Sequence, residues 1–240
     1  MADIFKGPPH GWSALVWEVG VVVVGVLIAL WAGQVLSDFN DRERREETRQ
    51  VLGAEIRLGL AHLAKRQHSE ACGARRLAEV EHWLDEDARG AKPLRPTLIG
   101  RPYAPLLGKD RFLSEQSAGR LVLLSNKDRS LIDEIYKSFD DFNTANTREI
   151  YDWAQLRSLA SSTASLDGAE RSRLRGAIQD ARAADLIIRL DMLSVAGPAA
   201  KLGLKPATDE FQDDVDGTVC LPMNPSSDQL KALQTAIDDI

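Results

Sequence analysis

The sequence lacks the short motifs that identify most enzymes and nucleotide-binding proteins. It has no glycine-rich phosphate-binding loop and no Gly-x-Ser-x-Gly motif, and its four histidines do not lie beside an obvious nucleophile. Basic residues are not in excess either, since 30 Lys and Arg accompany 36 Asp and Glu and the net charge is −6. Backbone recognition of nucleic acid needs clustered positive charge. We therefore expect no enzymatic activity, no cofactor and no nucleic-acid partner.

Two further absences concern the fold. Proline does not occur between Pro9 and Pro93, so a helix can run through this stretch without a forced break, and the alternating pattern of strands is nearly absent. These features predict an all-α protein, in which an N-terminal transmembrane helix continues into an antiparallel helical bundle. We expect a short tail over residues 1–12, a transmembrane helix over 13–36 and a soluble bundle domain over 37–240.

The longest apolar run extends from Ala14 to Leu36, and Glu18 is its only charged residue. As a helix rising about 1.5 Å per residue, the run is roughly 34 Å long, which is enough to cross a hydrocarbon core of about 30 Å. Cleavable signal peptides have a shorter apolar run, so we interpret this segment as an uncleaved signal-anchor in the lipid bilayer. Tryptophan favours the headgroup level, and three lie near the ends of the run: Trp12, Trp17 and Trp31.

One face of the anchor combines small residues with an acid. Gly25, Ala29 and Gly33 recur every four residues, the spacing that lets two helix backbones approach closely in lipid. Glu18 lies two turns earlier on nearly the same face, where a carboxyl group is costly and either finds a partner or reaches the headgroups. This face predicts association with another transmembrane helix, from a second copy or from a membrane complex.

Two observations bear on the side of the membrane that holds the domain. The positive-inside rule favours the cytoplasm, because four arginines follow the span: Arg42, Arg44, Arg45 and Arg49. The two cysteines, Cys72 and Cys220, both follow the anchor, and they fit either one disulfide in an exported domain or two buried free thiols.

Helical periodicity continues beyond the anchor. Apolar residues at spacings of three and four predict a first long helix to about Asp87, a second from a capping box at Ser125–Asp128 to about Ser165, and a third from Asp167 that Gly197–Pro198 stops. The stripes that we expect in the core are Leu52, Ile56, Leu60, Leu63, Leu77, Val80 and Leu84, then Ile132, Ile135, Phe139, Phe142, Trp153, Leu156 and Ala160, then Leu174, Ile178, Ala181, Ile188 and Met192.

Shorter elements connect these helices. Prolines and glycines predict irregular loops over 89–109, as a lid or a connector, and over 198–225. Between them we expect a short helix over 110–118 that ends at Gly119, and Ser226–Gln229 predicts a cap for a last helix carrying Leu230, Leu233 and Ile237.

Two groups of residues resemble metal ligands in composition. His68, Cys72, Glu79 and His82 share one helix face, but Cys72 and Glu79 are about 10 Å apart along the axis and a second Glu-x-x-His motif is missing. The acidic run Asp209–Gly217 does not match a calcium loop, since the bidentate Glu position falls on Met223. We therefore predict no metal site.

The anchor resembles a group of bacterial single-pass membrane proteins of unknown function, in which a Glu, an apolar run, a Gly, a second apolar run and Ala-Leu occur in this order, as in Glu18 to Leu30. The segments Ser117–Leu121, Asp128-Arg129 and Ile135-Tyr136 are similar to the second long helix of that group. The resemblance implies a membrane-anchored helical bundle outside the bacterial inner (plasma) membrane, with one cysteine on the first long helix and another near the C-terminus, as in Cys72 and Cys220-Leu-Pro222.

These observations favour a non-enzymatic, membrane-anchored accessory, scaffold or interaction subunit that associates through its transmembrane helix and its helical domain. The alternative is a single-pass sensory protein whose bundle binds a ligand between helices. We expect a periplasmic domain, with the cytoplasm as the other location that the charges allow.

Overall fold

The computed structural model describes residues 12–161, 165–207, 218–229 and 231, and these form helices, turns and loops without a strand. The helices are α1 (Trp12–Ala88), α2 (Asp110–Ser117), η1 (Arg120–Leu123), α3 (Asn126–Ser161), α4 (Gly168–Lys201) and η2 (Thr218–Cys220). The predicted all-α class is confirmed. The chain divides into two units, residues 1–49 and 50–240.

The first unit contains the N-terminal part of α1. This helix is long and apolar enough to cross a membrane, by length and composition. Each large apolar side chain from Val19 to Leu36 is at least 49% exposed, and the side chain of Trp12 lies outside the part of the structure that is described. The unit extends to Arg49 and includes residues 42–47, which are charged and exposed, whereas the predicted end of the membrane span at residue 36 stays a prediction.

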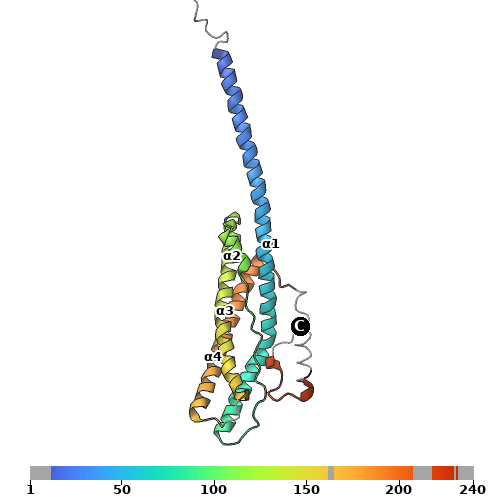
Figure 1. Ribbon diagram of the computed structural model, residues 1–240, viewed down its shortest axis with the longest axis vertical. Coiled ribbons are helices and arrows are strands. Elements are labelled where there is room, and N and C mark those ends of the chain that lie inside the picture. The colour runs from blue at the N-terminus through green and yellow to red at the C-terminus, as the bar shows by residue number, and fades with distance from the viewer. Residues whose placement is uncertain (1–11, 162–164, 208–217, 230, 232–240) are drawn as a thin grey trace, which may run out of the picture. The chain divides into compact units, whose positions relative to one another are not determined.

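The second unit is a bundle of three long helices: residues 50–88 of α1, α3 and α4 (Figure 1). Helix α1 ends at Ala88, one residue beyond the predicted end. At the start of α3, Ser125 Oγ accepts the backbone N–H of Asp128 at 3.0 Å, and at the start of α4, Asp167 Oδ1 accepts the backbone N–H of Glu170 at 2.7 Å. Both predicted caps are therefore present, as local sequence patterns require.

The ion pairs give the direction of each helix. Arg66 on α1 contacts Asp185 on α4, whereas Asp85 further along α1 contacts Arg175 earlier on α4, so these two helices are antiparallel. Helices α3 and α4 form an antiparallel hairpin (Figure 1). The predicted antiparallel arrangement thus holds for α4, while α1 and α3 run in parallel, because Glu55 contacts Tyr136 and the later Arg66 contacts Glu149.

The parallel pair is a consequence of the segment 89–109, called here the connecting segment, which returns along the bundle. Arg95 Nε donates to the carbonyl of Leu159 at 3.0 Å, and the carbonyl of Leu107 accepts a hydrogen bond from Asn143 Nδ2 at 2.9 Å, so the segment runs antiparallel to α3. Buried Ile99 and Leu107 anchor it in the core. The predicted loop boundaries are exact, and the segment is a packed connector rather than a lid.

The C-terminal end of α4 differs from the prediction. The helix passes through Pro198 and continues to Lys201, instead of stopping at Gly197–Pro198. Proline removes one backbone donor but does not force an end within the last turn. Gly203, with φ of 72°, makes the actual stop, since it donates to the carbonyl of Ala200 while Leu204 donates to that of Ala199. In the structure the loop predicted over 198–225 therefore begins four residues later than expected. Its residues 208–217 lie outside the described part of the chain.

The shorter elements follow the sequence more closely. Helix α2 ends just before Gly119, which adopts φ of 69° as a left-handed stop. Ser226 and Gln229 exchange the two hydrogen bonds of a capping box, at 2.8 and 3.3 Å. The apolar residues predicted for the helix that follows, Leu230, Leu233 and Ile237, lie outside the described residues.

The bundle core consists of two apolar clusters. One contains Phe139 and Phe142, and the other contains Trp153 and Leu156. The predicted stripes lie in these clusters, except that Leu60, Ala160 and Met192 are only partly buried and pack against them. Helix α3 thus contributes buried aromatic side chains to both clusters.

Candidate functional site

The predicted packing face lies on α1 within the first unit. By helix geometry, Glu18, Gly25, Ala29 and Gly33 fall within an arc of about 80°. All four are exposed, and a Cβ added at Gly25 or at Gly33 meets nothing within 4 Å. The face is therefore open and shallow within this chain.

The two cysteines form a disulfide that joins α1 to the C-terminal part of the chain. The Sγ atoms of Cys72 and Cys220 are 2.09 Å apart, and the bond spans 148 positions of the sequence. Neighbouring contacts fix the same segment, because the guanidinium of Arg76 donates to the carbonyls of Ile99 and Leu221. Val219 is fully buried in the second apolar cluster. The disulfide, Arg76 and Val219 therefore fasten residues 218–223 to α1 and to the connecting segment.

The residues considered as metal ligands do not come together. Cys72 is in the disulfide, the Glu79 carboxylate accepts Arg76 Nε at 2.9 Å, and His82 lies 3.4 Å from Glu86. His68 is exposed on α1. Among the described residues there is no group of three or more potential ligands that could hold a metal ion, and the acidic run 209–217 is outside them.

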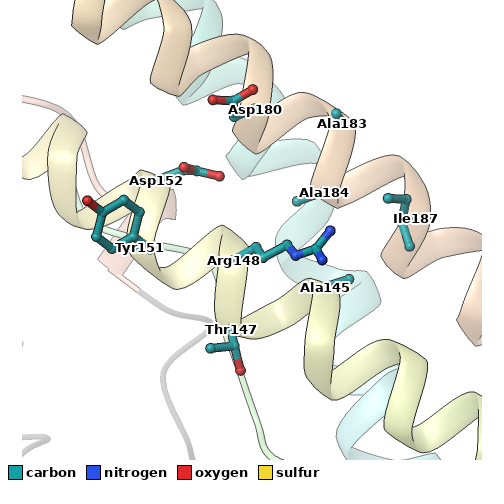
Figure 2. A pocket seen from close by; sticks show the side chains of 9 residues that line it. All are labelled: Ala145, Thr147, Arg148, Tyr151, Asp152, Asp180, Ala183, Ala184 and Ile187. Carbon is teal, nitrogen blue, oxygen red and sulfur yellow. The ribbon is translucent and has the colours of Figure 1, made fainter.

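A groove of about 470 Å³ lies between α3 and α4, and sequence reasoning did not predict it. Its lining is Ala145, Thr147, Arg148, Tyr151 and Asp152 from α3 with Asp180, Ala183, Ala184 and Ile187 from α4. Small side chains on both helices leave this space open. Figure 2 shows Asp152 directed toward α4, near Asp180, and Arg148 extended along the groove toward Ala184 and Ile187. The groove therefore has an apolar floor with charged groups above it.

Asp152 is the most unusual group of this groove. Only 8% of the residue is exposed, yet its carboxylate has no hydrogen-bond or ion-pair partner among the described residues. Burial raises the pKa of Asp152, and the carboxylate of Asp180 across the groove raises it further. A buried carboxylate without a donor destabilises the fold, which is typical of binding sites and active sites.

A second acidic pair lies about three turns away along the same two helices. Burial raises the pKa of Asp191 on α4, and Asp141 on α3 adds to this effect. Asp191 Oδ2 is buried and has no hydrogen-bond partner in the part of the chain that the structure describes. The α3 and α4 seam thus carries two pairs of like charges, which cost stability rather than contribute it.

A buried ion-pair cluster lies on the other side of this seam. Arg66, with a fully buried side chain, donates to Glu149 at 2.7 Å and to Asp185 at 3.1 Å, and so joins all three long helices. Burial raises the pKa of Glu149 although the Arg66 guanidinium opposes this. Because its charges are paired with each other, this cluster is structural.

One sequence signal for these sites was available. Glu149 and Asp152 interrupt the apolar stripe of the second predicted helix between Phe142 and Trp153, where a solvent-facing position is not expected. Comparisons of the chain with protein-family models, with curated proteins and with solved structures find no match, so its function has to be inferred from this geometry.

Proposed function

We propose that this protein is a non-enzymatic accessory, scaffold or interaction subunit, anchored in the bacterial inner membrane by one helix over residues 13–36. The observation that supports this most directly is the exposure of the apolar side chains between Val19 and Leu36, each large one at least 49% exposed. Such a surface is unfavourable in water, and a bilayer would cover it.

The proposed location of the bundle is the periplasm. The disulfide between Cys72 and Cys220 supports it, because such bonds persist in oxidising compartments and are rare in the cytosol. The charges after the span favour the opposite side, but a folded domain of this size is translocated largely regardless of them. We therefore give more weight to the disulfide.

The proposed partner is another transmembrane helix, which would pack on the face of Gly25, Ala29 and Gly33. Replacing Gly25 by Leu should prevent close approach on this face and reduce the size of the assembly in mild detergent, measured by analytical ultracentrifugation. Gly20 is the matched control, because it is also open but lies on the opposite side of α1. Gly20→Leu should leave the assembly unchanged.

Three outcomes of this experiment contradict the proposed helix pairing. One is a wild-type protein that sediments as a monomer, and another is a Gly25→Leu variant of wild-type size. The third is an equal effect of Gly20→Leu, because it would show a general response to added bulk. Membrane anchoring itself is tested separately, by carbonate extraction of the full chain from membranes.

A second candidate function is that of a single-pass sensor, and the groove between α3 and α4 favours it. A ligand held by both helices would favour the conformations of the hairpin in which α3 and α4 both contact it. A conformational response requires such a difference in affinity between conformations. Hydrogen exchange of α3 and α4 in the full chain, with and without a bound ligand, tests this function. Unchanged exchange in the presence of a ligand that binds would contradict it.

A further inference from the structure

Three charged side chains of the groove between α3 and α4 have no ion-pair partner among the described residues: Arg148, Asp152 and Asp180. Arg148 and Asp152 are one turn apart, at a spacing where opposite charges on a helix commonly pair. In Figure 2 Arg148 instead extends away from Asp152, toward Ala184. Both signs of charge are therefore available in one groove.

Two other grooves of the bundle differ in this respect. Between α1 and α4, in a groove of about 360 Å³, Glu70 lies 3.6 Å from Arg189. In a third groove, of about 420 Å³, the Glu55 carboxylate accepts the hydroxyl of Tyr136 at 2.6 Å. The principal acid in each of these two grooves is thus already satisfied within the chain, and the groove beside Asp152 is the better binding site.

We infer that this groove binds a small linear zwitterion, with an ammonium group between Asp152 and Asp180 and a carboxylate on Arg148. An ammonium has three donors, which suits two carboxylates from facing helices. The guanidinium of Arg148 has the planar pair of donors that a carboxylate accepts. The inference rests on the second candidate function and names its ligand class.

The spacing of the groups sets the length of the ligand. Four residues of α3 separate Arg148 from Asp152, a rise of about 6 Å, and the arginine side chain extends this further. A chain of a few methylene groups between the two charges would cover the distance. It would lie on the apolar floor formed by Ala145, Ala184 and Ile187.

A metal ion fits the groove less well than an ammonium does. The described residues offer no set of three ligands here, and the positive charge of Arg148 lies in the same groove. An ammonium needs only the two carboxylates and leaves Arg148 free to bind the acid end. Both ends of the proposed ligand are thus matched by groups that have no other partner among the described residues.

The experiment is isothermal titration of the full chain in detergent with 6-aminohexanoate, compared with hexylamine, hexanoate and 1,6-diaminohexane. We expect one binding site for 6-aminohexanoate. The three other compounds lack one of the two charges in the proposed places, and each should bind at least about tenfold more weakly than 6-aminohexanoate. Arg148→Gln and Asp152→Asn should each weaken binding of 6-aminohexanoate by about tenfold or more. Arg157→Gln, on the opposite side of α3, should leave it unchanged.

Several results would overturn the inference. They are the absence of binding at millimolar 6-aminohexanoate, equal or tighter binding of hexylamine, and an unchanged affinity in both groove variants. Tighter binding of 1,6-diaminohexane than of 6-aminohexanoate would also overturn it, because the groove would then prefer two ammonium groups. Circular dichroism establishes that each variant is folded. Binding without altered hydrogen exchange would retain the site and contradict only the sensory function.

Discussion

Loss of the disulfide between Cys72 and Cys220 should destabilise the bundle. The bond closes a loop that spans 148 positions, and the loop-entropy relation then gives roughly 17 cal/mol/K, or about 5 kcal/mol at 25 °C. This is the largest effect expected if the bundle and residues 218–223 unfold together. With a urea dependence of about 2.5 kcal/mol/M, the unfolding midpoint would fall by about 2 M.

The contacts beside the bond decide how much of this effect is global. The carbonyl of Met223 accepts the backbone N–H groups of Thr97 and Leu98 at 3.0 and 2.9 Å, and Val219 is fully buried. These interactions keep residues 218–223 bound to the bundle at low concentrations of urea. After reduction we expect the segment to detach first and the helices to unfold afterwards, so the midpoint of the bundle falls by less than the full amount.

The assay is urea unfolding of the full chain in detergent, comparing the oxidised protein with the Cys72→Ser, Cys220→Ser double variant. Near-ultraviolet circular dichroism reports the buried rings of Trp83 and Trp153. Hydrogen exchange at the backbone N–H groups of Thr97 and Leu98, which donate to the carbonyl of Met223, reports detachment of the segment. An unchanged midpoint together with unchanged exchange at these two groups would refute the reasoning.

Three further predictions concern single positions of the bundle. Arg66→Met should lower the free energy of unfolding by about 3–5 kcal/mol in urea titrations, because it leaves Glu149 buried without its cation; a loss below 1 kcal/mol would contradict this. Asp152→Asn should stabilise the chain by on the order of 1 kcal/mol at pH 7. The folded-state pKa of Asp152 is raised, so its destabilising effect is absent below the unfolded-state pKa and develops as the pH rises to and through the folded-state pKa. The difference in stability between Asp152→Asn and the wild type should therefore grow over that pH range and then stay constant. A difference that is independent of pH would be inconsistent with this prediction. Gly100→Ala should cost at least about 1–3 kcal/mol in thermal unfolding, because φ is 73° and the added Cβ lies 2.6 Å from the Thr218 backbone; wild-type stability would disagree with the packing described here.

Local patterns made much of the fold predictable. The cap at Asp167 and the left-handed stop at Gly119 depend on residues a few positions apart, so the sequence alone identifies them. The predicted stop at Pro198 was wrong, because proline removes only the hydrogen bond to the carbonyl four residues earlier and can kink a helix without ending it, and α4 continues to Lys201.

Long-range packing was not predictable in the same way. The course of the connecting segment depends on side chains such as Asn143 and Asn146, which accept and donate hydrogen bonds some 40 positions away. The groove depends on which residues of α3 face α4, and spacing within one helix does not determine that. The unusual position of Asp152 in an apolar stripe was visible in the sequence, but its proximity to Asp180 on the other helix of the hairpin was not.

The central proposal is a membrane-anchored protein whose disulfide-bonded bundle lies outside the cytoplasm. The direct test is cysteine accessibility in intact bacterial cells that express the full chain, using a maleimide and a reductant that do not cross the inner membrane. We predict no labelling before reduction and labelling of both Cys72 and Cys220 after it. Labelling that appears only after lysis, without any need for reductant, would place the bundle in the cytoplasm with free thiols and would contradict the proposal.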